Sequence, residues 1–514
     1  MTESIEVSNY THVYYISQQT GSDRNGDGSQ LRPYKSIRYA LNQIKINSEI
    51  NRIALFIGEG TYSGSTINMK PFVDLFGGFS SKTWERDIYK NTTVLHGENS
   101  RRVVVGSNNA LIDGFKIKEG LSRSHGGGIL CEDTSPTISN CFIVNNYVLE
   151  PDNFNNERIH QDGYHGGGIA CRYNAVPVIR NNVFYGNKTS IGNGAALSFY
   201  GWLRSENSPE REIVNNFMEG GWQPVVKNNV FIQNVSGVND INRTRSSNGA
   251  AISCAFEARP IIKNNVIVCN QAKGRSDAGG IYSEHFSYPE IIGNWILGNI
   301  CDDDGGGIYT NHTGHAVITG NYIAGNETIG KGVGGIRISK EGRASISHNI
   351  IVYNQSGGGV HSVDGYMALI NNVIMNNKGP ASVRITNHFN YFMPSTIDNN
   401  IIRDNEGIID IEESYKDKVI IKNNNIDNYS KPLKFNHDLI NGRFENIKFN
   451  DQIFQSIIFT NEIFDRNFIG RVIRIDKFWS VITKAESNKL FVWGNANWNP
   501  EDKNEFIILS DYQE

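Results

Sequence analysis

Much of the chain between residues 126 and 378 consists of short runs of β-branched and other apolar residues, three to five residues long, with period-two alternation. Gly and Asn residues separate the runs. Alternation with period two places successive side chains on opposite faces of a strand, and runs of this length are too short for helices. The pattern therefore predicts a chain of short strands joined by tight turns.

One motif recurs along this region and determines the expected fold. It reads GGGILCEDTSPTISNCFIVNN from Gly126, GGGIACRYNAVPVIRNNVFYGN from Gly166 and GGGIYTNHTGHAVITGNYIAGN from Gly305. Further copies begin at Gly249, Ala278, Val333 and Gly357, and divergent copies occur near Ala195, Ala381 and Ile408. A unit of this size buries its apolar face only against neighbouring copies, so we expect stacked coils of three short strands each, joined into parallel sheets.

Two series of asparagines recur at fixed offsets within the copies. The first series is Asn182, Asn229, Asn265, Asn294, Asn321, Asn349, Asn372, Asn400 and Asn424, and the second is Asn146, Asn187, Asn234, Asn270, Asn299, Asn326, Asn354, Asn377 and Asn405. Asn tolerates left-handed turn conformations, and its amide can bond to the same amide in the next layer. We interpret both series as ladders in the turns; the alternative is that they bind a ligand.

The stacked repeats resemble the pectate-lyase-like superfamily of right-handed parallel β-helix proteins, over roughly residues 10 to 430. The segment VYYISQQTGSDRNGDGSQLRPYKSIRYALNQIK resembles the strand, turn and capping helix with which bacterial members begin. Within it, Ile37, Ala40, Leu41 and Ile44 form one apolar helical face that can close the open end of the coils. The expected fold is therefore all-β: a single-stranded right-handed parallel β-helix, with an N-terminal helical cap and a small C-terminal β cap.

Three regions are expected along the chain. Residues 1–105 form the N-terminal cap and first coils, residues 106–428 the β-helix repeats, and residues 429–514 the C-terminal β cap. The Asn pattern stops near Tyr429, and GRVIRIDKFWSVITKAESNKLFVWGNANW has the character of antiparallel strands. We expect this segment to cover the last coil, whose edges would otherwise pair with other chains. The alternative is a separate sugar-binding module.

Composition excludes several classes of protein. The 514 residues are 39% hydrophobic and 20% charged, with 52 Gly and 13 Pro, which is typical of turn-rich globular structure rather than disorder. A net charge of −4 without a long basic run argues against nucleic acid, and the absence of a long apolar stretch argues against a membrane span. Recurring Cys131, Cys171 and Cys254 indicate small core residues rather than disulfides.

The sequence also bears on compartment and assembly. The first ten residues, MTESIEVSNY, lack the basic start and apolar run of a secretory signal. We expect a secreted or cell-surface protein whose signal is absent from this sequence, with a cytoplasmic protein as the alternative. No coiled-coil or trimerisation segment is recognisable, so a monomer is favoured.

The strand after each glycine run divides its side chains between core and surface. Residues expected to point inward are Cys131, Cys171, Phe199, Cys254, Ser283, Thr310, Ile338, Ser362 and Ile385. Residues expected to point outward are Leu130, Ala170, Ser198, Ser253, Tyr282, Tyr309, Arg337, His361 and Arg384. A second outward series contains Glu132, Arg172, Tyr200, Glu284 and Asn311, and the following turn supplies His285, His312, Lys340 and Asp364. Aromatic, acidic and basic side chains thus gather over residues 275 to 390.

These outward residues suit a site for an extended sugar chain. Tyr282, His285, Tyr309, His312, Asp364 and Arg384 are the expected substrate-binding residues, with sugar rings stacked on the tyrosines. The alternative is an ordinary solvated sheet face with cross-rung pairs.

Carboxylates gather in the turns that lead into two of these strands. Asp277 and the run Asp302, Asp303 and Asp304 precede the glycines, where other copies have His125, His165, Asn193 and Asn248. Paired carboxylates on neighbouring rungs can divide into a general acid and a base, as hydrolysis of a glycosidic bond requires. The same oxygens could hold Ca²⁺, and three Asp before glycine also make an ordinary turn. No cofactor other than Ca²⁺ is suggested, and metal ligands cannot be assigned.

We expect a carbohydrate-active enzyme that cleaves a polysaccharide or oligosaccharide, an acidic one being favoured. The expected catalytic residues are Asp277, Asp303, Asp304, Glu284, Arg337, Lys340 and His361. β-Elimination from a uronate needs a base and a cation, which Arg337, Lys340 and His361 supply, so a lyase is the leading hypothesis. The resemblance implies lyases with Arg or Lys bases and often Ca²⁺, but signatures of the well-known families are absent. A glycoside hydrolase and a non-catalytic carbohydrate-binding or adhesive solenoid are the alternatives.

Overall fold

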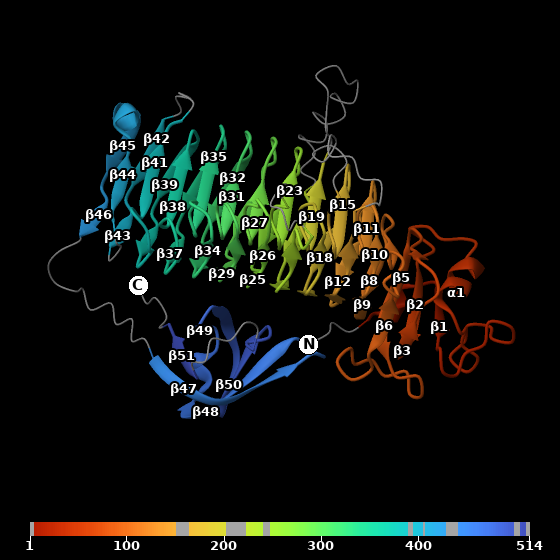
Figure 1. The fold of residues 1–514 in the computed structure, drawn as a ribbon. Helices are drawn as coiled ribbons and strands as arrows, with labels where there is room; N and C mark the ends of the chain where they lie inside the picture. The colour runs from red at the N-terminus through yellow and green to blue at the C-terminus, as the bar shows by residue number, and fades with distance from the viewer. Residues whose placement is uncertain are drawn as a thin grey trace, which may run out of the picture.

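The computed structural model describes residues 5–150, 164–201, 223–239, 247–388, 394–403, 407–427, 440–497 and 504–509. Their strands stack into parallel coils whose sheets run the length of the molecule, with a small barrel at one side (Figure 1). A 14-stranded sheet runs from β1 (His12–Ile16) to β45 (Val419–Lys422), a 13-stranded sheet from β3 (Gly60–Tyr62) to β46 (Asn425–Asp427), and a 7-stranded sheet from β10 (Leu121–Ser122) to β34 (Glu327–Thr328). The parallel β-helix expected from the repeat is confirmed.

The strands that follow the glycine runs form a separate 12-stranded sheet, which carries the candidate site. In order, its strands are β4 (Ile67–Asn68), β7 (Val104–Val105), β11 (Ile129–Glu132), β15 (Ile169–Arg172), β19 (Leu197–Tyr200), β23 (Ile252–Ala255), β27 (Ile281–Ser283), β31 (Ile308–Thr310), β35 (Ile336–Ser339), β38 (Val360–Val363), β41 (Val383–Thr386) and β44 (Ile409–Ile411). All neighbouring pairs in this sheet are parallel.

A continuous apolar core fills the interior of the coils. Every residue of the predicted inward series is buried, from Cys131 at the first repeat to Ile385 near the last. Cys131, Cys171 and Cys254 lie in this core as free thiols, as expected. Because alternate residues of each strand point inward, each coil adds an apolar layer against which the next coil packs.

The two asparagine series form ladders inside the turns. In the first series, the backbone N–H and the side-chain amide of Asn265 both donate to Oδ1 of Asn294, at 2.9 Å each. The Asn265 amide also donates to the carbonyl of Val226, at 3.0 Å. The same three bonds recur from Asn182 to Asn400, and the second series repeats them from Asn146 to Asn354. The ladder interpretation is confirmed.

Left-handed backbone in these turns falls on the residue before each ladder asparagine. Asn181 and Asn264 have φ of 57° and 55°, and the corresponding position in a later coil is Gly293, with φ of 62°. The ladder asparagine therefore contributes its amide, while its predecessor contributes the left-handed conformation that Gly and Asn adopt at least cost.

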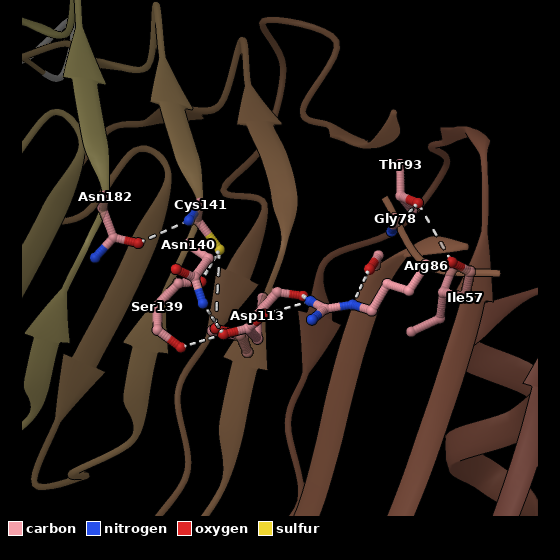
Figure 2. A network of polar contacts seen from close by, with 11 residues as sticks. Ile57, Gly78, Arg86, Thr93, Asp113, Ser139, Asn140, Cys141 and Asn182 are labelled. Atoms are coloured by element: carbon pink, nitrogen blue, oxygen red, sulfur yellow. Dashed lines mark hydrogen bonds and ion pairs between the residues drawn. The ribbon is translucent and has the colours of Figure 1, made fainter. Parts of the chain in front are cut away.

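The first asparagine ladder ends toward the N-terminus at a buried ion pair (Figure 2). Asn182 accepts a hydrogen bond from the backbone N–H of Cys141, at 2.9 Å, but Cys141 has no amide to continue the ladder. Beyond it, the carboxylate of Asp113 pairs with Arg86 and accepts hydrogen bonds from Ser139 and Asn140. In the first coils, polar groups near the turns are thus paired with charged side chains, whereas in the later coils they are paired with side-chain amides.

Short helices close both ends of the core. Helix α1 (Ile37–Gln43) begins at Ser36, whose side chain accepts a hydrogen bond from the backbone of Tyr39, and it buries Ile37, Ala40 and Leu41 against the first coil. At the other end, the 3₁₀ helix η3 (Glu413–Lys418) buries Tyr415 in the same core. Among the described residues, no helix has the length and apolarity needed to cross a bilayer.

The C-terminal segment forms a closed barrel that docks on the side of the coils (Figure 1). Its strands are β47 (Ile440–Asn450), β48 (Gln455–Phe464), β49 (Val472–Ile475), β50 (Phe478–Trp493) and β51 (Glu505–Ile508). Trp479 joins Leu297 and Ala324 of the 13-stranded sheet in one apolar cluster. The segment is β structure, as predicted, but it covers this flank rather than the last coil.

Glycine at two turns makes room for the docked barrel. A Cβ at Gly298 would lie 2.7 Å from the Trp479 ring, and one at Gly325 would lie 2.1 Å from it. Any larger residue would displace the indole, because distances under about 3 Å are not tolerated between such atoms. The sequence shows these glycines, but the partner that requires them lies more than a hundred residues away.

Removing one ladder amide should destabilise the coils. In Asn265→Ala, the N–H and amide of Asn229 and the carbonyl of Val226 lose their buried partner, so we expect the free energy of unfolding to fall by about 3 kcal/mol. Asn264→Gly, at the exposed left-handed position next to it, should change stability little. Urea unfolding followed by circular dichroism measures both; equal midpoints for the two variants would contradict the ladder's role.

Candidate active site on the 12-stranded sheet

The predicted outward residues form one row across the 12-stranded sheet, which we call the outer row. Each residue is the register partner of the next: Leu130, Ala170, Ser198, Ser253, Tyr282, Tyr309, Arg337, His361, Arg384 and Asp410. Adjacent strands are about 4.8 Å apart, so neighbouring side chains of the row are in contact range. The large functional side chains are concentrated in its second half, from Tyr282 onward.

The two tyrosines of the outer row are buried. Tyr282 and Tyr309 are each 2% exposed and lie 5.7 Å apart between ring centroids. The Tyr282 hydroxyl donates to Glu284, at 2.8 Å, and the Tyr309 hydroxyl bonds to Ser339. The expectation that sugar rings stack directly on these tyrosines does not fit this burial. The two rings form the buried base of the site, beneath the polar groups around them.

A third ladder runs along the turns just before the glycines, and we call it the pre-glycine ladder. In it, one side-chain atom accepts a hydrogen bond from the backbone N–H of the corresponding residue in the next coil. The pairs are His125 with His165 (3.3 Å), His165 with Asn193 (2.9 Å), Asn193 with Asn248 (2.8 Å), Asn248 with Asp277 (2.8 Å) and Asp277 with Asp304 (3.1 Å). The ladder thus changes from imidazole to amide to carboxyl along the stack.

The carboxyl end of this ladder has an unusual electrostatic environment. Burial raises the pKa of Asp277 well above its usual range, and Asp304 and Asp303 raise it further. Burial also raises the pKa of Asp304, although Arg337 opposes this shift. Arg337 lies 3.5 Å from the Asp304 carboxylate, whose side chain is 23% exposed. Asp277 therefore holds a proton more readily than an ordinary aspartate, whereas Arg337 favours the ionised form of Asp304.

An aromatic stack lies along the opposite edge of the outer row. The ring of His285 stacks on Phe256 at 4.7 Å and on His312 at 5.0 Å, and Lys340 Nζ lies 3.3 Å from His312 Nε2. His285, His312 and Lys340 all have positive φ, between 41° and 48°, a conformation that side chains other than Gly seldom adopt. This turn conformation therefore places the side chains of His285, His312 and Lys340 beside the two buried tyrosines of the outer row.

Glu284 belongs to this edge of the site. It is 7% exposed, and its Oε2 lies 3.0 Å from Nδ1 of His285. Burial raises the pKa of Glu284, but His285 and Tyr282 outweigh it, so the net shift is downward. Glu284 is therefore an ionised hydrogen-bond acceptor rather than a proton donor.

His361 is a neutral bridge between Arg337 and the next strand. Its Nδ1 contacts Arg337, and its Nε2 lies 3.1 Å from the Thr386 hydroxyl. Burial, Arg337 and Arg384 lower the pKa of His361 to about 2. Both ring nitrogens are engaged and the ring is a very weak base, so His361 positions Arg337 instead of accepting a proton.

Two predicted binding residues lie apart from the carboxyl pair. Arg384 pairs with Asp410, at 3.0 Å, toward the end of the outer row. Asp364 is 2% exposed, and its Oδ1 accepts a hydrogen bond from the backbone of His388, at 2.6 Å. Asp364 therefore stabilises a turn, and we do not place it against substrate.

The structure brings Asp303 to the same turn as Asp304. Its backbone N–H donates to Ser276, at 3.1 Å, and its carboxylate adds to the negative potential at Asp277. No group of three His, Cys, Asp or Glu side chains in the described part of the chain is arranged to hold a metal ion. Calcium at this turn remains an expectation.

Sequence inspection identified most of these residues but not the interaction that joins them. The signal is a polar residue immediately before the first glycine of each copy, from His125 to Asp304. Long insertions over 147–164, 200–222 and 235–247, which include Trp202 and Trp222, are a further signal in the sequence, because long loops in compact folds are usually functional. Residues 151–163, 202–222 and 240–246 lie outside the described residues.

Comparison with known proteins supports the fold. The profile of the right-handed β-helix region family matches residues 279–441, and that of a family of unknown function, DUF1565, matches residues 19–270. No curated protein matches the chain.

Several solved structures are similar at low identity. A GH136 lacto-N-biosidase from Eubacterium ramulus is 12% identical, covering 80% of this chain and 68% of its own, with a TM-score of 0.40. XylC in complex with xylose is 11% identical, covering 96% and 100%, with a TM-score of 0.39. A mannuronic acid specific polysaccharide family 6 lyase from human gut microbiota is 14% identical, covering 79% and 85%, with a TM-score of 0.37.

Identities this low say nothing about the chemistry of the present chain. The match to the right-handed β-helix region agrees with the parallel sheets, the inward apolar series and the asparagine ladders described above. The chain is therefore a right-handed parallel β-helix protein.

Proposed function

We propose that this protein is a carbohydrate-active enzyme that hydrolyses a glycosidic bond at the carboxyl end of the pre-glycine ladder. The observation that carries the proposal is the pair Asp277 and Asp304, which lie on adjacent rungs with their pKa values raised to different extents. Glycoside hydrolysis needs one carboxylic acid to protonate the leaving oxygen and one carboxylate to assist attack on the sugar. Here Asp277 is the acid and Asp304 the carboxylate.

The ladder position of Asp277 is compatible with a neutral side chain. At the two preceding rungs the equivalent residues are Asn193 and Asn248, which are neutral. A protonated Asp has the same shape as Asn, with one oxygen accepting from the next rung and an O–H in place of the amide. The ladder bond by itself favours the carboxylate, but burial and the neighbouring Asp304 and Asp303 outweigh it and favour the neutral acid. Unlike Asn, that acid can release its proton.

Asp304 differs because a cation lies beside it. Arg337 contacts the Asp304 carboxylate on one side and His361 on the other, so the guanidinium is fixed in place. A fixed cation stabilises the ionised form of Asp304 and can also bind an acidic group of the substrate. The exposed Lys340 adds positive charge nearby, which supports an acidic polysaccharide or oligosaccharide as substrate.

β-Elimination is the second candidate, because Arg337 can neutralise a uronate carboxylate. A base to remove the C5 proton is harder to find among the described residues. His361 is buried with a pKa of about 2, and the tyrosines have pKa values raised by burial. Lys340 is the exposed candidate for that base. A binding solenoid without catalysis is the third possibility, and it predicts that no product forms.

Replacing the acid should abolish hydrolysis without unfolding the turn. Asp277→Asn keeps the acceptor for Asp304 and matches Asn248, so we expect a folded protein whose kcat falls by about 10²–10⁴-fold. The control variant Asp302→Asn makes the same chemical change nearby. The Asp302 carboxylate accepts a hydrogen bond from the backbone N–H of Gly274, and this variant should retain activity. Reducing-end assays on an active substrate compare them; equal activity of Asp277→Asn and wild type would refute the assignment.

The pH dependence of activity should follow the acid. Because its pKa is raised well above the usual range, Asp277 keeps its proton to a higher pH than an ordinary aspartate and loses it as the pH rises further. We expect kcat/KM to fall on the alkaline side through the ionisation of Asp277. A rate that increases steadily with pH would instead indicate a base such as Lys340.

A substrate panel separates the three candidate functions. Neutral, uronate-containing and sulfated polysaccharides would be incubated with the enzyme, with and without EDTA, while reducing ends and ultraviolet absorbance are followed. We expect reducing ends without absorbance, because only elimination leaves a conjugated, unsaturated uronate. Absorbance would establish a lyase. Loss of activity with EDTA would indicate a metal requirement, and its recovery on adding Ca²⁺ would establish calcium as the metal.

The neutral state of His361 makes a prediction about stability. The unfolded chain protonates this histidine near its usual pKa of about 6.5, whereas the folded chain resists protonation down to a pKa of about 2. The folded state is therefore disfavoured progressively as the pH falls below about 6.5. In His361→Gln, thermal melting should depend less on pH between 7 and 4 than in wild type; parallel curves would contradict the buried neutral state.

A further inference from the structure

The outward face of the 13-stranded sheet changes character at the edge of the docked barrel. Beneath the barrel its outward residues are apolar, as at Val144 and Val183. On the preceding strand, β9 (Phe115–Lys118), the register partners of Phe142 and Val144 are Lys116 and Lys118. Two lysines thus lie at the edge of the surface that the barrel covers. In the following coils, the equivalent positions of the sheet are apolar.

A cavity of about 300 Å³ lies at this position. It is bounded by strands β6 (Thr93–His96) and β9, by the segment before β6 and by the β47–β48 turn of the barrel. The residues that matter for its chemistry are Tyr89, Thr92, His96, Lys116, Lys118 and Gln452. None of the described residues that line it is Asp or Glu.

The cavity carries more positive than negative charge. Glu119, outside the lining, is shared by two of the basic residues, since its carboxylate lies 2.7 Å from Lys118 and 3.0 Å from His96. Lys116 contacts the carbonyl of Asp451, at 3.4 Å, and the ring of Phe454, at 5.1 Å, and it forms no ion pair with a carboxylate among the described residues. Burial and Lys118 lower the pKa of Lys116, and the carboxylate of Asp451 opposes this less strongly. An anion in the cavity would offset the unfavourable burial of the positive charge on Lys116.

An aromatic side chain is available at the rim. Tyr89 is 61% exposed, in contrast to the buried tyrosines of the outer row. Its ring meets Phe142 edge-on at 6.1 Å, which orients it beside the cavity. An exposed, oriented ring next to polar donors is the arrangement that stacks on the apolar face of a pyranose.

We propose that this cavity binds a single uronic-acid unit of an acidic saccharide. The sugar carboxylate would pair with Lys116 and Lys118, the ring would lie against Tyr89, and hydroxyl groups would face Thr92 and Gln452. The volume suits one monosaccharide rather than a chain segment. The cavity lies on a different sheet from the carboxyl pair, four rungs from the coil of Asp277 and five from that of Asp304, which is about 19–24 Å along the stack. It is therefore a second, non-catalytic site that would anchor a long substrate.

The test is a binding titration on the full chain with D-glucuronate and D-galacturonate, with glucose, galactose and acetate as comparison ligands. Saturation-transfer difference NMR should show a preference of at least about tenfold for a uronate over its neutral sugar and over acetate. Tyr89→Ala, at an exposed side chain that the core does not need, should weaken uronate binding about fivefold to tenfold. Lys116→Met should remove the preference for the charged sugar.

Controls separate this site from the proposed active site. Lys90→Met changes an exposed lysine next to Tyr89 that does not line the cavity, and it should bind as wild type does. Asp302→Asn, near the carboxyl pair but without a role in it, should also keep full uronate binding. Because the titration measures binding and not turnover, a failure of the proposed hydrolysis would leave this result intact. Equal affinity for uronate and neutral sugar, wild-type affinity in Tyr89→Ala, or no binding of any uronate at 20 mM would each overturn the proposal.

Discussion

The stacking of the coils depends on hydrogen-bond partners for the buried backbone groups at their turns. A turn buried between coils carries N–H and carbonyl groups that water cannot reach, and each unpaired group costs about 1–3 kcal/mol. The two asparagine ladders provide these partners. The oxygen of each amide accepts from the previous coil, and its nitrogen donates to the asparagine oxygen of the next coil and to a carbonyl of the previous coil. Since the same bonds recur at each coil, the turns stack in register, and the sheets between them follow.

The candidate active site is a chemical variation on this structural solution. The pre-glycine ladder uses the same side-chain-to-backbone bond, but the acceptor changes from His165 through Asn193 and Asn248 to Asp277. The backbone therefore needs only an acceptor at that point, and the rest of the side chain is free to carry chemistry. A protein built this way can gain a buried acid with one substitution, without altering the path of its chain.

The fold could be predicted from the sequence because the same pattern of apolar, Gly and Asn residues recurs in many copies. Inward residues such as Cys131 and Ile385, the ladder asparagines and the capping face of Ile37 and Leu41 all lie as periodicity indicates. Prediction failed where a contact joins distant segments. The docking of Trp479 on Gly298 and Gly325 has no local signal, and neither does the burial of Tyr282, which depends on side chains of neighbouring coils. Residue types located the candidate site, whereas the roles within it required the geometry of the third ladder.

The docked barrel also has a consequence for how this architecture can evolve. An array of stacked coils is open-ended, and whole coils can be gained or lost without disturbing their neighbours. Here Trp479 rests on two particular coils, and the chain reaches the barrel only after completing the final strand β46. An added coil between Gly325 and Asp427 would lengthen by about 4.8 Å the gap that the same connection must span. The docking of Trp479 thus ties the barrel to two particular coils, and any change in the number of coils after them changes the distance between the barrel and the end of the stack.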